Sequence, residues 1–412
     1  MPVTNKLSQP LTRRLMRPGM LAGRAMRGGG ADYEDGIHLD FVHDFHYVKV
    51  PGRPPIVADF ESLFNFTGDN LSYYRGANGL LLPSVTNKKR REFDLLGNPL
   101  GLLIEGQRTN QILHSRDHTN AAWVKVTMTA AKDQVGEDGV ANSASSLLAT
   151  GAAATSLQTI VQAATDSTLS LSIKRLVGTG TIGIAQDGVT FTDVTSQINS
   201  STWTRVTLRA TQLNPALGIR LGTSGDKIAV DFAGFEAGSS ATSRIPTTTA
   251  SVLRAVDAAV RVVGAEASSI NTVFIEGIPP RSFSTNDSMW MYSYDSNAAF
   301  SNFQTMLLSA NGTAYQLHNY LAGSSTGIIT GGVPVVFTAY KVSGGFDLNN
   351  YALSLNGAIV GTDLIGALPI NQTHLRLGIA PDSASGIWFG HIRRFDYWPE
   401  RKPNGFLQAI TG

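Results

Sequence analysis

The stretch that decides the fold is Thr168-Leu-Ser-Leu-Ser-Ile-Lys174, in which apolar and polar residues alternate without interruption. Successive side chains of a β-strand point to opposite faces of its sheet, so the two leucines and the isoleucine share one dry face. The same alternation recurs at 205–210 and at 228–232. Several strands with one apolar face, separated by Gly, Asn and Asp turns, predict an antiparallel β-sandwich over residues 105–245.

The C-terminal part of the chain repeats this β character. Asn-Gly pairs at 311–312 and 356–357 lie between alternating segments, and Asn-Gly is the strongest short signal for a hairpin. We therefore expect a second antiparallel sandwich, of jelly-roll type, over residues 252–412. Residues 51–104 are predicted to be a linker and transitional β region, because Pro and Gly are concentrated at 51–55.

Length and composition agree with an all-β protein of more than one domain. The chain has 412 residues, which exceeds one ordinary domain, and its 42% hydrophobic content excludes a wholly disordered chain. Cysteine is absent, which excludes disulfides, thiolate metal sites and cysteine nucleophiles. No stretch approaches the roughly 20 apolar residues of a membrane-spanning helix, so no membrane span is expected.

Charge is unevenly distributed, because residues 1–30 hold six basic residues and no acidic ones. Pro10, Pro18 and the glycines at 28–30 interrupt any helix, so we expect residues 1–50 to form an extended arm. Interspersed leucines and methionines favour an arm that docks on a partner protein over a solvated terminus. Nucleic-acid binding is a third alternative, but basic residues without interleaved aromatic residues predict no specific nucleic-acid site. The candidate docking residues are Arg13, Arg14, Arg17, Arg24 and Arg27.

Motifs for catalysis, cofactors and metals are weak. Residues 178–183 match a dinucleotide-binding glycine pattern and residues 323–327 match a nucleophile elbow, but each is followed by a strand rather than the required helix. His38, His43 and His46 do not have the spacing of a standard zinc site. We therefore predict no catalytic residue, no cofactor and no metal, and we expect the protein not to be an enzyme.

The segment Met289-Trp-Met-Tyr-Ser-Tyr294 is the most distinctive binding feature. Strand periodicity places Trp290, Tyr292 and Tyr294 on one face, where they would form an aromatic platform for sugar rings. The alternative is that this face lines the core of the sandwich, with the two methionines pointing outward. Trp123 and Trp203, which precede or enter strands, are predicted to fill the core of the first sandwich.

Several segments resemble structural proteins of tailed bacteriophages and prophages. The phrase Gly101-Leu-Leu-Ile-Glu-Gly-Gln-Arg-Thr-Asn110 is similar to a segment that in those proteins introduces a carbohydrate-binding-module-like β-sandwich. The similarity continues through Asn120–Trp123, Asp138–Asn142, Trp203–Val206, Ser224–Asp226, Phe235–Gly238 and Ile245–Ser251. The closing Gly390–Tyr397 segment and the tail at Phe406–Ile410 resemble the end of a concanavalin-A-like jelly roll in phage fibre proteins, although Lys402-Pro403 departs from the usual lead into that tail.

This resemblance implies a component of the virion surface. The leading expectation is a non-enzymatic fibre or appendage, docked to other virion proteins by its N-terminal arm and displaying its sandwiches for attachment to host-surface polysaccharide. Such appendages are homo-oligomers, and a trimer is favoured. A capsid head fibre or decoration protein is the alternative within this class. A glycan-cleaving tail spike is the alternative of another class, and would require two carboxylates about 5–10 Å apart in a cleft.

Overall fold

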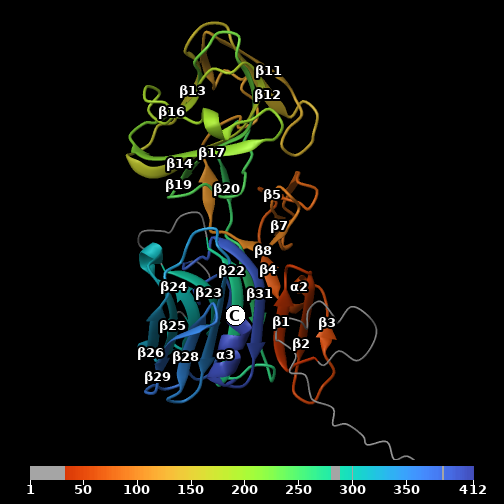
Figure 1. Ribbon diagram of the computed structural model, residues 1–412, viewed down its shortest axis with the longest axis vertical. Coiled ribbons are helices and arrows are strands. Elements are labelled where there is room, and N and C mark those ends of the chain that lie inside the picture. Colours follow the sequence, from red (N-terminus) through yellow and green to blue (C-terminus); the bar gives the residue numbers. More distant parts are fainter. Residues whose placement is uncertain (1–32, 280–287, 299, 383–384) are drawn as a thin grey trace, which may run out of the picture.

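The computed structural model describes residues 33–279, 288–298, 300–382 and 385–412. Within these ranges the chain consists mainly of antiparallel strands with only short helical segments, so the all-β prediction is confirmed. Two β-sandwiches are stacked along the long axis of the molecule and are joined by a narrow stalk (Figure 1). Among the described residues, no helix is long and apolar enough to cross a membrane.

The inserted sandwich, the upper body in Figure 1, consists of two five-stranded sheets. Their strand orders are β10-β13-β18-β15-β16 and β11-β12-β19-β14-β17. Leu169, Leu171 and Ile173, the apolar residues of the alternating stretch, are fully buried in its core. The strands are β10 (Val124–Val126), β11 (Met128–Gln134), β12 (Ala144–Ala149), β13 (Ala154–Thr159), β14 (Thr165–Val177), β15 (Ile182–Ala185), β16 (Thr192–Asp193), β17 (Thr204–Gln212), β18 (Ala216–Leu221) and β19 (Lys227–Ala237), with a 3₁₀ turn, η2 (Thr195–Gln197).

The discontinuous sandwich, the lower body, packs a ten-stranded sheet against a seven-stranded one. The ten-stranded sheet contains β1 (Gly36–Asp40), β2 (Phe45–Lys49), β3 (Ile56–Val57), β7 (Arg91–Phe93), β8 (Pro99–Ile104), β22 (Asn271–Ile278), β27 (Tyr340–Phe346), β28 (Tyr351–Leu355), β29 (Ala358–Asp363) and β31 (Gly390–Trp398). The seven-stranded sheet contains β4 (Asn65–Thr67), β21 (Ala258–Val262), β23 (Met289–Asp295), β24 (Phe303–Leu308), β25 (Tyr315–Leu321), β26 (Ser324–Gly331) and β30 (His374–Leu377). The helices are α2 (Phe60–Leu63), η3 (Ala310–Gly312) and α3 (Asn404–Thr411).

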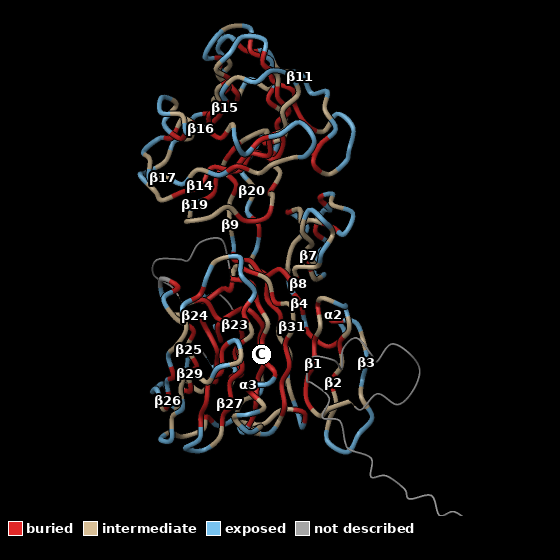
Figure 2. Tube along the Cα trace, in the orientation of Figure 1, coloured by how far each residue is buried: buried red, intermediate tan, exposed pale blue. Residues whose placement is uncertain are grey.

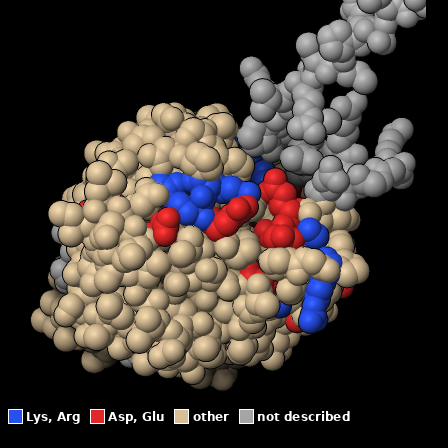
Figure 3. Space-filling view, turned by 90° about the horizontal axis from the view of Figure 1, so that it is seen from below, with Lys and Arg blue, Asp and Glu red and all other residues tan. Residues whose placement is uncertain are grey.

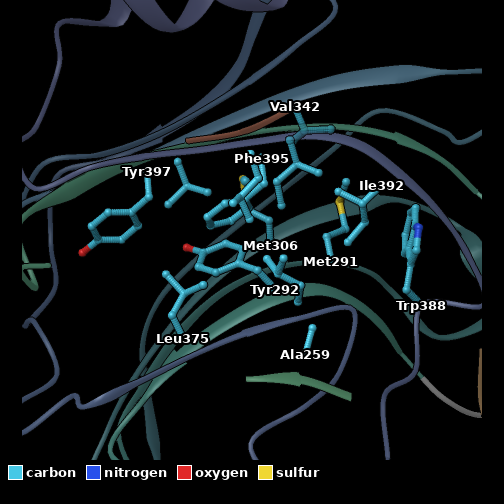
Figure 4. Packing of buried hydrophobic residues seen from close by; sticks show 14 of the residues in the cluster. Ala259, Met291, Tyr292, Met306, Val342, Leu375, Trp388, Ile392, Phe395 and Tyr397 are labelled. Carbon is cyan, nitrogen blue, oxygen red and sulfur yellow. The ribbon is translucent and has the colours of Figure 1, made fainter. Parts of the chain in front are cut away.

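The core of this sandwich lies between its two sheets, where the chain is buried along most strands (Figure 2). Both sheets contribute large side chains to it (Figure 4). The rings of Tyr292 on β23 and Phe395 on β31, for example, have centroids 5.9 Å apart across the interface. The apolar pattern of the C-terminal region therefore does form a sandwich core.

The prediction of an arm that extends to residue 50 is wrong for residues 36–49. These residues form β1 and β2, and β1 pairs along its length with β31, the last strand of the chain. Ile37 and Leu39 are buried against the core, which is why the segment folds back onto its own sandwich. Residues 1–32, with Arg13, Arg14, Arg17, Arg24 and Arg27, lie outside the described residues, so the docking arm stays a prediction there.

For residues 51–104, predicted to be a linker and transitional β region, the β character is present but the linker part of the prediction is wrong. This segment forms β3, β4, α2, β7 and β8, and β8 pairs with β31. It also forms the hairpin of β5 (Tyr73–Arg75) and β6 (Leu81–Pro83), which lies beside the inserted sandwich. The jelly roll expected over 252–412 is thus completed by strands from the N-terminal part of the chain.

The chain crosses between the two sandwiches twice. It leaves the discontinuous sandwich after β8, rises through β9 (Arg108–Asn110), and returns through β20 (Val252–Arg254), which pairs antiparallel with β9. The upper sandwich is therefore an insertion between β8 and β21. The β5–β6 hairpin adds a second link, because the backbone N–H of Tyr73 donates to Arg244 O at 2.8 Å and that of Leu81 to Glu137 O at 3.2 Å.

Candidate functional site

A cleft with a volume of about 490 Å³ lies where the two sandwiches meet. Its walls come from the β7–β8 hairpin, from residues 203–205 and 240–244 of the inserted sandwich, and from residues 278–279, 337 and 389–391 of the discontinuous sandwich. This volume falls within the roughly 300–1,000 Å³ that is usual for ligand pockets. The cleft is thus large enough for a ligand of several rings.

Aromatic rings from both sandwiches line the cleft. Lys174 Nζ lies 5.2 Å from the ring of Trp203, and Arg108 Cζ lies 4.6 Å from the ring of Phe389. A cation packed on one face holds an aromatic ring in a defined plane. The four lining rings are Trp203 from the inserted sandwich and Phe93, Phe337 and Phe389 from the discontinuous one.

Two of these phenylalanines have an unusual backbone conformation. Phe337 has φ 58° and Phe389 has φ 54°, in the left-handed region that bulky residues rarely adopt. Gly106 accommodates Phe389, because a Cβ at position 106 would lie 2.3 Å from Cζ of that ring. Non-glycine residues in this region cost about 1–3 kcal/mol each and concentrate at ligand sites.

Carboxylates in the cleft are held in their ionised form. Glu92 Oε2 lies 2.7 Å from His391 Nε2, and Glu92 Oε1 accepts a hydrogen bond from the backbone N–H of Arg75. Burial alone would raise the pKa of Glu92, but the contact with His391 holds that pKa below its ordinary value. The hydrogen bond from the Asn98 side chain likewise lowers the pKa of Asp94.

Glu105, on the floor of the cleft, belongs to the ionic cluster, a group of buried polar side chains at the base of the stalk. Its carboxylate accepts hydrogen bonds from Arg90 Nη1 at 2.7 Å and from Ser243 Oγ at 2.5 Å. Burial alone would raise the pKa of Glu105, but the charges of Arg254 and Arg90 lower it far below its ordinary value. The ionic cluster comprises Arg90, Glu105, Ser243, Arg254 and Asp257.

Arginines that line the cleft are anchored in the wall of the inserted sandwich. Glu137 Oε1 accepts hydrogen bonds from Arg75 Nη2 at 2.5 Å and from Arg244 Nη2 at 2.7 Å. Arg205 donates to Thr242 O at 2.5 Å. The cleft therefore combines fixed aromatic rings with guanidinium donors and ionised carboxylate acceptors.

The Gly101–Asn110 segment connects β8 to β9, the first strand of the stalk. A Cβ at Gly101, which has φ 119°, would lie 2.4 Å from Ile392 O, so this position requires glycine. The side-chain amide of Asn110 donates to Ala233 O at 3.0 Å and to Ile245 O at 2.7 Å, and thereby joins the two ends of the inserted sandwich. This segment thus supplies Glu105 to the floor of the cleft and, through Asn110, holds the two ends of the inserted sandwich together.

The aromatic platform predicted on β23 is wrong, because its three rings are buried. Trp290 is 7% exposed, Tyr292 is 0% exposed and Tyr294 is 4% exposed, so they present no surface to a sugar. A bulge between Trp290 and Tyr292 in the pairing with β24 changes the phase of alternation. Tyr292 and Tyr294 therefore lie in the main core with the two methionines of β23, whereas Trp290 packs in a separate cluster with Phe303.

The two tryptophans of the inserted sandwich differ. Trp123 is 1% exposed, stacks on His118 with ring centroids 3.9 Å apart and donates to His114 O, so the core prediction is confirmed for it. Trp203 is only partly buried and lines the cleft, so the core prediction is wrong for it. Trp203 lies just before β17, outside the sheet, so the alternation of side chains along a strand does not determine which way its ring points.

Phe337 and Phe389 were not predicted as site residues. Phe337 ends the apolar run Val333-Pro-Val-Val-Phe337, which follows two glycines and does not alternate. Phe389 directly follows Trp388, and two adjacent large aromatic residues cannot both enter one core from a regular strand. These two sequence patterns indicate that Phe337 and Phe389 lie outside a regular strand core. They do not indicate that the two side chains line the same cleft.

The histidines near the N-terminus have separate partners. His38 contacts Asp396, His43 contacts Asp40 and His46 contacts Asp44. No group of three or more histidine, aspartate or glutamate side chains within the described ranges is placed to hold a metal ion. The two glycine-containing motifs lead into strands β15 and β26, as predicted, rather than into helices.

The end of the molecule farthest from the inserted sandwich is sparsely charged (Figure 3). On the visible part of this face, the Lys and Arg side chains lie beside Asp and Glu side chains.

Comparisons with known proteins give only partial similarities. No protein-family model and no curated protein matches the chain. The CBM40 carbohydrate-binding module of the Ruminococcus gnavus IT-sialidase is 15% identical, over 35% of this chain and 84% of that chain, with a TM-score of 0.30. Domain 4 of AbnA, a GH43 extracellular arabinanase from Geobacillus stearothermophilus, is 9% identical over 38% and 73% of the two chains, with a TM-score of 0.32. A heptameric SAP-like pentraxin from Limulus polyphemus is 17% identical over 35% and 70%, with a TM-score of 0.28. At these TM-scores the similarities bear neither on the function nor on the ligand of this chain.

Proposed function

We propose that this protein is a non-enzymatic structural component of a phage-like particle that binds host-surface glycan in the cleft between its two sandwiches. The observation that carries glycan binding is the cleft itself, which brings Trp203 and three phenylalanine rings together with ionised carboxylates and arginines. Sugar rings have apolar faces that stack on aromatic rings, and their hydroxyls hydrogen bond to charged side chains.

The state of the carboxylates supports a binding role over glycan cleavage. A glycosidase needs a general acid whose pKa is raised, so that it carries a proton near neutral pH. The pKa values of Glu92, Asp94 and Glu105 are all lowered by their partners. These groups are suited to accept hydrogen bonds from hydroxyls rather than to donate a proton to a leaving group.

The phage assignment is supported by the resemblance of the Gly101–Asn110 and Gly390–Tyr397 segments to phage structural proteins. In this proposal the basic residues of the first 32 positions attach the protein to other virion proteins. The sandwiches project outward as part of a homo-oligomeric fibre, for which a trimer is favoured. A capsid head fibre or decoration protein is the alternative. Electron microscopy of particles labelled at Gly412 separates these, because the label would lie on the tail or neck for a fibre and on the capsid for a head protein.

The glycan site is tested by Trp203→Ala in a screen of host-surface polysaccharides. We expect this variant to lose at least about tenfold in affinity, because a buried stacking contact at a binding centre is worth 1.4 kcal/mol or more. Phe191→Ala is the matched control, since Phe191 also packs under a cation, Arg220 at 4.4 Å, but does not line the cleft.

Unchanged affinity in Trp203→Ala, or no glycan bound by the unaltered protein, would overturn the cleft as the site. Release of reducing sugar from a host polysaccharide by the purified protein would instead support the glycan-cleaving tail spike.

A further inference from the structure

We propose that the cleft is a two-module site, in which one glycan contacts both sandwiches at once, and that the ionic cluster is the positioning element that holds the two halves at the required separation. This inference rests on the proposed glycan binding in the cleft. It adds that affinity depends on Arg90, Arg254 and Asp257, buried members of the cluster that do not line the cleft.

The two halves of the cleft belong to separately folded bodies. Trp203 and Arg205 come from the inserted sandwich, whereas Phe389 and His391 come from the discontinuous one. The two hydrophobic cores share no residue. A ligand that contacts both halves binds with high affinity only when the two sandwiches already have the correct spacing. Otherwise the loss of their relative motion on binding lowers the affinity.

The stalk alone is a weak device for fixing this spacing. β9 and β20 pair through only three residue pairs, from Arg108↔Arg254 to Asn110↔Val252. An isolated two-stranded ribbon is marginally stable in water. Further contacts are therefore needed to hold the inserted sandwich in one orientation.

The ionic cluster supplies these contacts at the base of the stalk. Arg90 reaches two carboxylates with its two terminal nitrogens, Glu105 from Nη1 and Asp257 from Nη2. Glu105 also accepts from the backbone N–H of Ser243 at 2.8 Å, and its own N–H donates to Asp257 at 2.8 Å. The cluster thus ties together the outgoing chain, the returning chain and the segment just before β7, and its four charged members are 1–5% exposed.

A second link joins the β5–β6 hairpin to the inserted sandwich, next to the ionic cluster. Arg75 of the β5–β6 hairpin and Arg244 of the returning chain converge on Glu137, which is 2% exposed. Because Arg75 and Arg244 also line the cleft, this link holds the wall itself. The ionic cluster and the Glu137 link therefore both connect the inserted sandwich to the N-terminal part of the chain.

Arg90→Lys tests the positioning role, because lysine keeps the positive charge but presents one ammonium group in place of a two-pronged guanidinium. The chain has no cysteine, so Ala152→Cys in the inserted sandwich and Ala358→Cys in the discontinuous one allow clean spin labelling at two exposed positions. Pulsed electron paramagnetic resonance then gives the distribution of distances between the sandwiches. Binding of the best polysaccharide from the screen is measured on the same protein.

We expect Arg90→Lys to broaden the distance distribution and to weaken glycan binding about five- to tenfold, a typical size for coupling between interacting groups. Trp203→Ala should weaken binding without broadening the distribution. Arg261→Lys is the matched control, because Arg261 makes a two-pronged, partly buried pair with Glu266 and belongs neither to the ionic cluster nor to the lining of the cleft. Arg261→Lys should change neither the distance distribution nor the affinity for the glycan.

A distance distribution unchanged by Arg90→Lys would overturn the positioning role, and unchanged binding with a broadened distribution would overturn the two-module site. If Arg90→Lys does not fold, Glu137→Gln carries the same test through the second link. If the unaltered protein binds no glycan, the proposed function and the two-module site both fail, while the distance distributions still decide whether the ionic cluster positions the sandwiches.

Discussion

Two tryptophans with similar sequence surroundings have opposite roles. We expect Trp123→Ala to lower the free energy of unfolding of the inserted sandwich by about 3–5 kcal/mol, because it removes a fully buried indole from the core. Trp203→Ala should change that free energy by less than about 1 kcal/mol, since its ring is partly exposed at the cleft. Urea unfolding followed by circular dichroism measures both. Equal losses in the two variants would contradict the division into a core residue and a cleft residue.

Glu105 makes stability depend on pH. Its pKa in the folded protein is lowered from the ordinary 4.5, so its ionised form stabilises the fold at any pH above that value. This stabilisation is lost as the pH falls below 4.5 toward the lower folded pKa. We expect Glu105→Gln to be less stable than the unaltered protein at pH 7 and to lose less stability on acidification. Glu400→Gln, at an exposed carboxylate, is the control, and an identical acid response in Glu105→Gln and the unaltered protein would refute the assignment.

At the scale of elements, the sequence predicts strands well where alternation is uninterrupted. β14 has the buried face that its leucines and isoleucine indicate, whereas β23 does not have the face that its aromatic residues indicate. A bulge after Trp290, in the pairing of β23 with β24, interrupts the alternation of side chains between the two faces of the sheet. Trp290 and Tyr292 therefore do not share a face as regular alternation predicts. Alternation within one strand contains no information about such a bulge, so the predicted glycan platform failed for a physical reason.

β1 and β2 are integral to the discontinuous sandwich, so removal of residues 1–50 should unfold that sandwich. The deletion exposes the edge of β31 and removes Ile37 and Leu39 from the core. We expect a chain that begins at residue 51 to lose the near-ultraviolet circular dichroism of this sandwich, whereas a chain that begins at residue 33 keeps every contact described above. A stable fold in the shorter chain would contradict the assignment of β1 to the sheet.

At the scale of the whole molecule, the sequence predicts two sandwiches but not how the chain builds them. β1 pairs with β31 across nearly the full length of the chain, and such a non-local pairing leaves no periodic signal near either strand. The Pro- and Gly-rich 51–55 segment indicated a linker, yet Phe60 just after it is fully buried. The cleft forms only because one sandwich is inserted into the other, so the sequence does not predict it. Two of its residues, Trp203 and Glu105, nevertheless lie in segments that resemble phage structural proteins.

The insertion topology predicts that each sandwich folds without the other. All core residues of the inserted sandwich lie between Ile112 and Phe235, and β9 and β20 bring its two ends side by side. We expect residues 107–251, produced alone, to unfold cooperatively and to keep the fluorescence of a buried Trp123. Replacement of residues 111–251 by a short glycine–serine loop should leave the discontinuous sandwich folded, since the loop only has to join adjacent strands. Failure of the excised sandwich to fold, with success of the loop variant, would mean that contacts with the rest of the chain, such as those of the β5–β6 hairpin with Glu137 and Arg244, are required for the insertion to form at all.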